Sequence, residues 1–142
     1  MTLERLLLEI GQVGIKDKLI NFSCGGSSIF EINSLTIKEY PILYISPTGN
    51  HNVTENYTEF ELTLYYIDRL LEDSSNDVNI HSVGIEALKN IINKIKRIDG
   101  VLDVSNEYTI ILFKETEGMS DRCSGAYAQV RVTVQNGNNC GL

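Results

Sequence analysis

Two histidines are the first side chains in this sequence whose chemistry could serve a reaction. His51 and His81 could each act as a general base, but no nucleophile is placed beside either of them by a recognisable spacing. Both lie in polar segments, where a histidine exposed on a loop is the commoner case. The sequence therefore does not favour catalysis by either histidine.

The acidic residues between positions 68 and 77 offer carboxylate oxygens, which are ligands for a hard cation such as Ca²⁺. They are Asp68, Glu72, Asp73 and Asp77. Their spacing lacks the alternate positions and the central glycine of a calcium-binding loop. We therefore expect a solvated acidic connection and no metal site.

The stretch 25–28, Gly-Gly-Ser-Ser, has the composition of a phosphate-binding loop. It lacks the following lysine and the strand–loop–helix context that such loops need. The sequence also contains no G-x-S-x-G motif and no dinucleotide-binding fingerprint. We therefore predict that the protein is not an enzyme and uses no cofactor.

Composition and charge narrow the class of protein. The 142 residues are 42% hydrophobic and 22% charged, as in a soluble globular protein, and no apolar run reaches the ~20 residues that span a bilayer. The N-terminus lacks the features of a signal peptide, so no membrane association is expected. The net charge of −7 disfavours a protein that binds nucleic-acid phosphates. Cys24, Cys123 and Cys140 lack C-x-x-C spacing and are expected to be reduced thiols.

The elements that would position these residues centre on a strand and a helix. Residues 57–67 alternate with period two, which predicts a long strand with one buried face. Its apolar face carries Phe60, Leu62, Leu64 and Tyr66, and its other face carries Glu59, Glu61, Thr63 and Tyr65. After the polar connection, residues 82–99 place Ile85, Leu88, Ile92 and Ile95 on one stripe of a helix. Ser82 is the expected N-cap and Gly100 the expected stop, and the helix should pack on the sheet.

The remaining sequence adds one short helix and several strands. The helix is expected from residue 2 to Gly11, and further strands at 19–22, 29–32, 40–45, 107–114 and 126–134, with 46–56 as an extended hairpin tip. This order predicts an α+β fold, a mostly antiparallel sheet of four to six strands with two helices packed on one face. We assign residues 1–135 to a single domain and 136–142 to a flexible C-terminal tail.

Two segments resemble phage head–tail joining proteins. The first is Tyr57 to Leu88, and the second, at 121–127, is Asp-Arg-Cys-Ser-Gly-Ala-Tyr. Over roughly residues 40–134 the chain is similar to the small neck or tail-completion proteins of crAss-like Bacteroides phages. The expected order of elements is also similar to the tail-terminator fold of long-tailed phages.

This resemblance implies a structural protein of the virion, made in the cytoplasm of the bacterial host. Copies would form a ring in the neck or complete the tail, next to portal, adaptor or tail proteins, and DNA would pass nearby without specific binding. The loop 46–56 and the tail 136–142 are candidates for docking onto neighbouring rings. The candidate interface or channel residues are Glu59, Glu61, Tyr65, Asp68, Glu72, Asp73, His51 and Asn52. The alternative is a small bacterial protein- or ligand-binding module that uses the exposed face of the sheet.

Overall fold

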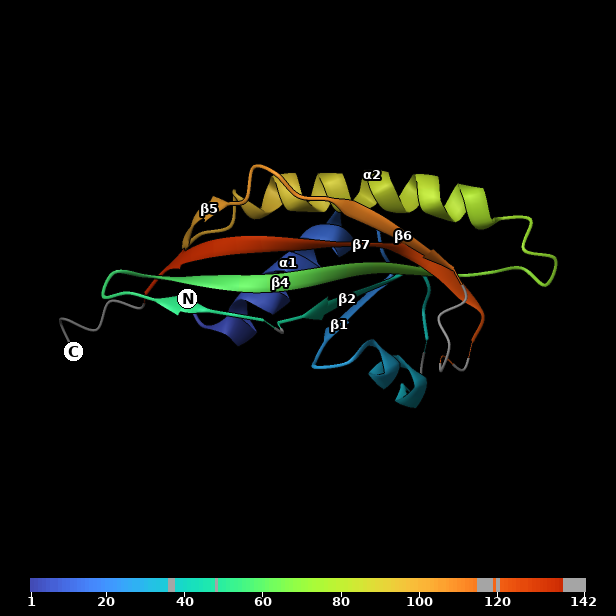
Figure 1. The fold of residues 1–142 in the computed structure, drawn as a ribbon, viewed down its shortest axis with the longest axis horizontal. Helices are drawn as coiled ribbons and strands as arrows, with labels where there is room; N and C mark the ends of the chain where they lie inside the picture. Colours follow the sequence, from blue (N-terminus) through green and yellow to red (C-terminus); the bar gives the residue numbers. More distant parts are fainter. Residues whose placement is uncertain (36–37, 48, 115–118, 120, 137–142) are drawn as a thin grey trace.

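A computed structural model describes residues 1–35, 38–47, 49–114, 119 and 121–136. These residues form two α-helices, one 3-10 helix and seven strands (Figure 1). In chain order the elements are α1 (Leu3–Lys16), β1 (Phe22–Gly25), η1 (Ile29–Ser34), β2 (Ile42–Ser46), β3 (Asn52–Val53), β4 (Tyr57–Arg69), α2 (Asp77–Ile95), β5 (Val101–Val104), β6 (Ile110–Lys114) and β7 (Cys123–Gln135). Of the tail expected at 136–142, the structure describes only Asn136, whose backbone N–H donates to the carbonyl oxygen of Asn56 at 3.0 Å; residues 137–142 lie outside the described residues.

The two longest strands, β4 and β7, form the middle of the sheet. They pair antiparallel over 13 residues each, from Tyr57 opposite Gln135 to Arg69 opposite Cys123. β2 and β3 pair with the other edge of β4, β5 and β6 pair with the other edge of β7, and β1 pairs with β2. Among the described strands only the β1–β2 pair is parallel. The predicted α+β class with a mostly antiparallel sheet is therefore confirmed.

The described part of the chain has more strands than the four to six expected. The additional strands are β3, with two residues, and β5, with four. Such short strands carry too few residues to show a period-two pattern. They are strands because they pair with β4 and β7, and their residue composition alone does not indicate a strand.

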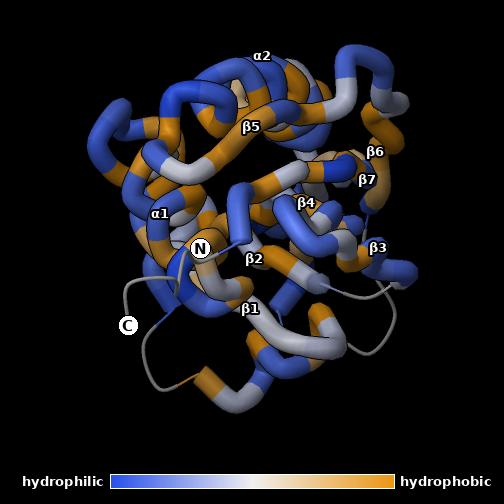
Figure 2. The backbone as a smooth tube through the Cα atoms, turned by 90° about the vertical axis from the view of Figure 1, so that its left-hand side faces the viewer, coloured by the Kyte–Doolittle hydropathy of each residue, from blue (hydrophilic) through white to orange (hydrophobic). Residues whose placement is uncertain are grey.

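The main core lies between the helices and one face of the sheet, with both helices on the same side of the strands (Figures 1 and 2). The predicted apolar face of β4 is confirmed, because Leu62, Leu64 and Tyr66 are buried and Phe60 packs against them. Three residues of the predicted stripe of the second helix, Leu88, Ile92 and Ile95, are buried here too, whereas Ile85 is only half-buried. The α2 and α1 members of this core are Ile80, Ala87, Leu88, Ile91, Ile92, Ile95, Leu6 and Ile10.

A second, smaller apolar cluster lies on the opposite face of the sheet. The chain between β1 and β2, which includes η1, covers this face near β2 and buries Ile32 against Tyr44 and Ile67. The face of β4 that carries the candidate interface residue Tyr65 is therefore not exposed along its whole length. Ile67 is 0% exposed and Tyr65 is partly buried in the cluster. Alternation along β4 predicts the two faces correctly but contains no information on a cover supplied by a distant segment.

Three local expectations are also corrected. The expected strand at 29–32 is the 3-10 helix η1, which is capped by Ser28, whose Oγ accepts from the backbone N–H of Phe30 at 3.3 Å. The first helix continues past Gly11 to Lys16. A Cβ at Gly11 would lie 2.5 Å from Ser23 Oγ, so this glycine permits close packing of α1 on β1 instead of ending the helix. The second helix begins at Asp77, five residues before the expected N-cap.

Candidate functional site

Four of the eight candidate residues lie together at one end of the sheet. His51 and Asn52 lead into β3, where Asn52 is opposite Glu59. The backbone N–H of Glu61 donates to His51 Nδ1 at 3.3 Å, and His51 Nε2 lies 3.1 Å from the carbonyl oxygen of Pro47. This geometry fits a neutral imidazole whose proton is on Nε2. Both ring nitrogens are engaged, so His51 fixes the β3–β4 hairpin.

The carboxylate of Glu61 is paired. Its side chain is 18% exposed, and its Oε2 accepts from Arg131 Nη2 at 3.1 Å. Gln129 Nε2 donates to Oε1 of the same carboxylate. Arg131 and Gln129 project from β7 on the same face of the sheet as Glu61. Glu59, Glu61 and Arg131 together therefore leave one net negative charge on this part of the face.

Tyr65 and Asp68 are on opposite faces of β4. The Tyr65 ring packs on the face of the sheet that points away from α1 and α2, which we call the outer face. Its centroid lies 5.3 Å from that of Tyr127 and 6.3 Å from that of Tyr44. Asp68 is three positions further along the strand, so its side chain points to the helix side. Burial raises the pKa of the Asp68 carboxyl, an effect that the N–H donated by Arg69 at 2.8 Å partly offsets. Asp68 therefore cannot line the same wall as the outer-facing residues of β4.

Glu72 and Asp73 lie in the connection from β4 to α2, beyond the other end of the strand. The guanidinium of Arg122 fastens this connection by donating to the carbonyl oxygen of Glu72 at 2.7 Å and to Ser74 Oγ at 2.8 Å. The Asp73 carboxylate accepts from the backbone N–H of Ser75 at 3.0 Å, which lowers the pKa of Asp73. Both residues therefore belong to a hydrogen-bonded turn beyond Arg69, and the strand between Glu59, opposite β3, and Arg69 is roughly 33 Å long.

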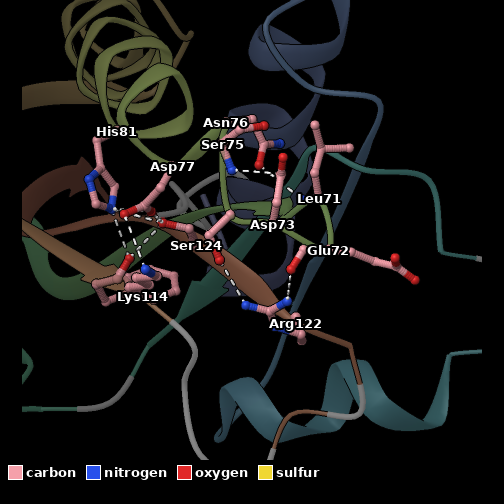
Figure 3. A network of polar contacts seen from close by, with 12 residues as sticks. Leu71, Glu72, Asp73, Ser75, Asn76, Asp77, His81, Lys114, Arg122 and Ser124 are labelled. Atoms are coloured by element: carbon pink, nitrogen blue, oxygen red, sulfur yellow. Dashed lines mark hydrogen bonds and ion pairs between the residues drawn. The ribbon is translucent and has the colours of Figure 1, made fainter.

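Sequence reasoning missed a polar cluster formed by Ser124, Asp77 and His81 (Figure 3). Ser124 is on β7, and Asp77 and His81 are one turn apart at the start of α2. Ser124 Oγ donates to Asp77 Oδ1 at 2.5 Å and lies 2.8 Å from His81 Nε2. The carbonyl oxygen of Phe113, on β6, lies 3.0 Å from both Ser124 Oγ and His81 Nε2. Three separate elements thus meet at one hydroxyl group.

The geometry of this cluster differs from that of a hydrolytic Ser-His-Asp triad. In a triad the acid contacts Nδ1 of the histidine and the serine contacts Nε2. Here Asp77 Oδ1 lies 3.4 Å from Nε2, the same nitrogen that approaches Ser124. Ser124 is also 0% exposed, so a substrate carbonyl has no access to its hydroxyl. The cluster joins α2 to β6 and β7, and its only sequence signal is the four-residue spacing of Asp77 and His81.

A groove of about 290 Å³ lies between α1 and the outer edge of β1. Its apolar wall is α1, with Leu7, Leu8 and Ile15, and Cys24 of β1 also lines it. Burial, and next the negative charge of Glu31, raise the pKa of the Cys24 thiol to about 11. Because the thiolate is the nucleophile, a thiol with this pKa is weakly reactive at neutral pH. The Cys24 side chain packs in the second apolar cluster on the other face of the sheet, so only the α1 side chains give the groove its apolar character and suit it to contact with apolar groups.

Comparison with known proteins gives no family for this chain: no protein-family model matches it, and no curated protein matches it. Within the described ranges, no three His, Cys, Asp or Glu side chains are grouped so that they could hold a metal ion. None of the helices in the described part of the chain combines the length and apolar character needed to cross a bilayer. Function is therefore inferred from the residues and their geometry.

Proposed function

We propose that this chain is a structural virion protein of a tailed phage, which forms a ring in the neck or completes the tail around the DNA channel. In this role it contacts copies of itself and neighbouring portal, adaptor or tail proteins, and it catalyses no reaction. The proposal starts from the resemblance of residues 57–88 and 121–127 to head–tail joining proteins. Its strength depends on whether those two segments form one structural unit.

The observation that carries the proposal is the close joining of these two segments (Figure 3). The backbone N–H of Leu70 donates to the carbonyl oxygen of Arg122 at 2.9 Å, and Arg122 donates to the carbonyl oxygen of Glu72. Two residues further on, Ser124 donates to Asp77 at the start of α2. The segments are separated by more than 30 residues of sequence, yet they build one corner of the fold. The two segments that carry the resemblance therefore belong to one structural unit, which supports the proposal.

The charge distribution refines how DNA would pass. An acidic channel wall made jointly by Glu59, Glu61 and Asp68 does not fit the fold, because Asp68 points to the other face and Glu61 is paired with Arg131. The outer face near β3 instead offers an ion pair and polar side chains with a small negative excess. Such a surface gives phosphates no net attraction, in keeping with passage of DNA without specific binding.

Electron microscopy of virions tests the proposal. Antibodies against the purified chain are applied to tailed particles from the culture whose phage genome encodes it. We expect label at the head–tail junction, and we expect the chain to co-assemble with the purified portal complex. Intact, infectious particles in which mass spectrometry detects none of this chain would refute the proposal.

A second function, a small bacterial protein- or ligand-binding module, is favoured by the groove between α1 and β1. The groove has apolar walls and an open strand edge beside it, which fits an extended peptide. The two functions predict different partners. A binding module captures a soluble peptide as a monomer, whereas a neck protein uses the same edge in an assembly.

A further inference from the structure

Four of the described strands, β1, β3, β5 and β6, are paired on one side only, and β1 and β6 lie on opposite sides of the sheet. Within the described residues, β1 pairs with β2 alone and β6 pairs with β7 alone. Each therefore has an outer edge whose backbone N–H and C=O groups can pair with another strand. With strands about 4.8 Å apart, the four spacings from β1 to β6 place these edges roughly 19 Å apart on opposite sides of the sheet.

The directions of the strands make the two edges complementary. β6 is antiparallel to β7, β7 to β4 and β4 to β2, and β2 is parallel to β1. β1 and β6 therefore run in opposite directions. If a second copy lies beside the first in the same orientation, its β6 meets β1 as an antiparallel pair, the slightly more stable arrangement. The helices of both copies then lie on the same face.

On the helix side, β1 leaves room for incoming side chains. The two residues of β1 on this face are the small Ser23 and Gly25. A Cβ at Gly25 would lie 3.4 Å from Leu7, so α1 passes directly above this edge. Leu8 and Ile15 of α1 remain 60% and 40% exposed beside the groove. The edge is thus a slot with a small-residue floor and an apolar wall.

The exposed side chains of β6 fit this slot. Leu112 is opposite Ala126, which belongs to the main core, so Leu112 points to the helix side, and it is 45% exposed. In the antiparallel arrangement, Leu112 of one copy projects into the groove of its neighbour, beneath Leu8. Ile111 points to the other face and is 46% exposed. Two apolar side chains exposed at adjacent positions of an edge strand are normally covered by a partner.

The same alignment determines which charged side chains of the two copies meet. Leu7 lies over Gly25 and Gly11 over Ser23, so α1 is antiparallel to β1 and Glu4, which also lines the groove, lies at the Gly25 end. Pairing of β1 with β6 in opposite directions brings this end to Ile110. Lys89 of α2 lines the same surface hollow as Ile110, and its side chain is 52% exposed. The alignment therefore places Lys89 of one copy near Glu4 of the other. Lys89 is also 3.4 Å from Glu86, and Glu107 lines the same hollow, so the register is set by the strand pairing and the fit of Leu112 and not by charge alone.

We infer that β6 of one copy of this chain adds to β1 of the next, with Leu112 in the groove beneath α1, and that this head-to-tail contact builds the ring. The inference rests on the proposed function, because a ring needs two different complementary surfaces on each subunit. A two-fold dimer would instead join β1 to β1 or β6 to β6. The two arrangements predict different cross-links.

Engineered thiols distinguish them. The starting chain carries Cys24→Ser and Cys140→Ser, and Cys123 is kept because it is 0% exposed. Leu8→Cys, Leu112→Cys and the two together are treated with a short bismaleimide at high protein concentration, and products are resolved on a denaturing gel. The matched control pairs Leu8→Cys with Leu71→Cys, which is 55% exposed but lies beyond the end of β4, away from both edges.

We expect a ladder of dimers, trimers and larger species from the Leu8→Cys/Leu112→Cys chain. A mixture of the two single variants should give one heterodimer. Neither single variant alone nor the control should give a cross-linked product. A dimer from a single variant alone would overturn the head-to-tail contact in favour of a two-fold one. Absence of the ladder, with thermal unfolding unchanged, would also overturn it. A ladder from a chain that is missing from virions would refute the proposed function and leave the interface standing.

Discussion

Replacing Ser124 by alanine tests whether the buried hydroxyl joins α2 to the sheet. Ser124 Oγ donates to the Asp77 carboxylate at 2.5 Å and lies 2.8 Å from His81 Nε2. Alanine removes both contacts, and it leaves the Asp77 and His81 side chains, 21% and 19% exposed, each without one partner. The Ser124→Ala chain should therefore be less stable than wild type.

The size of the effect follows from the loss of a hydrogen bond to a charged group, which costs about 1.5–3 kcal/mol when the groups are fully buried. Because water reaches part of Asp77 and His81, we expect a loss of about 1–2 kcal/mol. For a chain of this length the loss lowers Tm by about 3–8 °C. The m-value of urea unfolding should not change, because alanine alters neither the native core nor the surface exposed on unfolding.

The assay is urea unfolding followed by circular dichroism, with Ser82→Ala as the matched control. Ser82 is exposed on α2, five residues after the helix begins, so its substitution should change stability by less than about 0.5 kcal/mol. If Ser82 were the N-cap, alanine there would cost about 1 kcal/mol. A neutral Ser124→Ala together with a destabilising Ser82→Ala would refute both the cluster and the helix start.

Three further substitutions test other parts of the fold. Gly125→Ala places a Cβ 1.8 Å from the carbonyl oxygen of Tyr66, so we expect a loss of more than about 3 kcal/mol or failure to fold, measured by the same urea assay. Asp68→Asn removes a carboxyl whose folded-state pKa is raised by burial. The contribution of this carboxyl to the stability of the wild-type chain is most favourable below the unfolded-state pKa and is lost as pH rises through the folded-state pKa. The variant should therefore be more stable than wild type at pH 7, and the difference in Tm should fade below about pH 4 when Tm is measured as a function of pH. Arg122→Ala removes the guanidinium that donates to the carbonyl oxygen of Glu72, so amide exchange in the β4–α2 connection should quicken at a stability cost of about 1 kcal/mol; unchanged exchange there would contradict the anchoring role.

Local periodicity explains which elements were predictable. β4, α2 and β7 each contain enough residues to display period two or period 3.6, so their existence and buried faces follow from the residue order alone. η1 was mistaken for a strand because four largely apolar residues fit a buried strand equally well. The cap from Ser28 and burial of Ile32 against Tyr44 select the helical turn.

The candidate site was less predictable, for a related reason. Alternation along β4 is sufficient to place Asp68 on the opposite face from Glu59 and Glu61, so these three candidate residues cannot line one wall. The pairing of Glu61 with Arg131 was not predictable, because it depends on the register of β7 against β4. No local sequence pattern indicates which residue of one long strand lies opposite a given residue of the other.

By itself, the sequence determined the α+β class, the long central strand with its buried face, and the helix that covers it. Each of these follows from the spacing of apolar residues along a short stretch of the chain. Only the tertiary structure decided the second apolar cluster, the joining of Ser124 to Asp77 across 47 residues and the two open edges of the sheet. These features depend on which distant segments meet. That choice is made by the packing of the whole chain, where the burial of one element depends on the position of all the others.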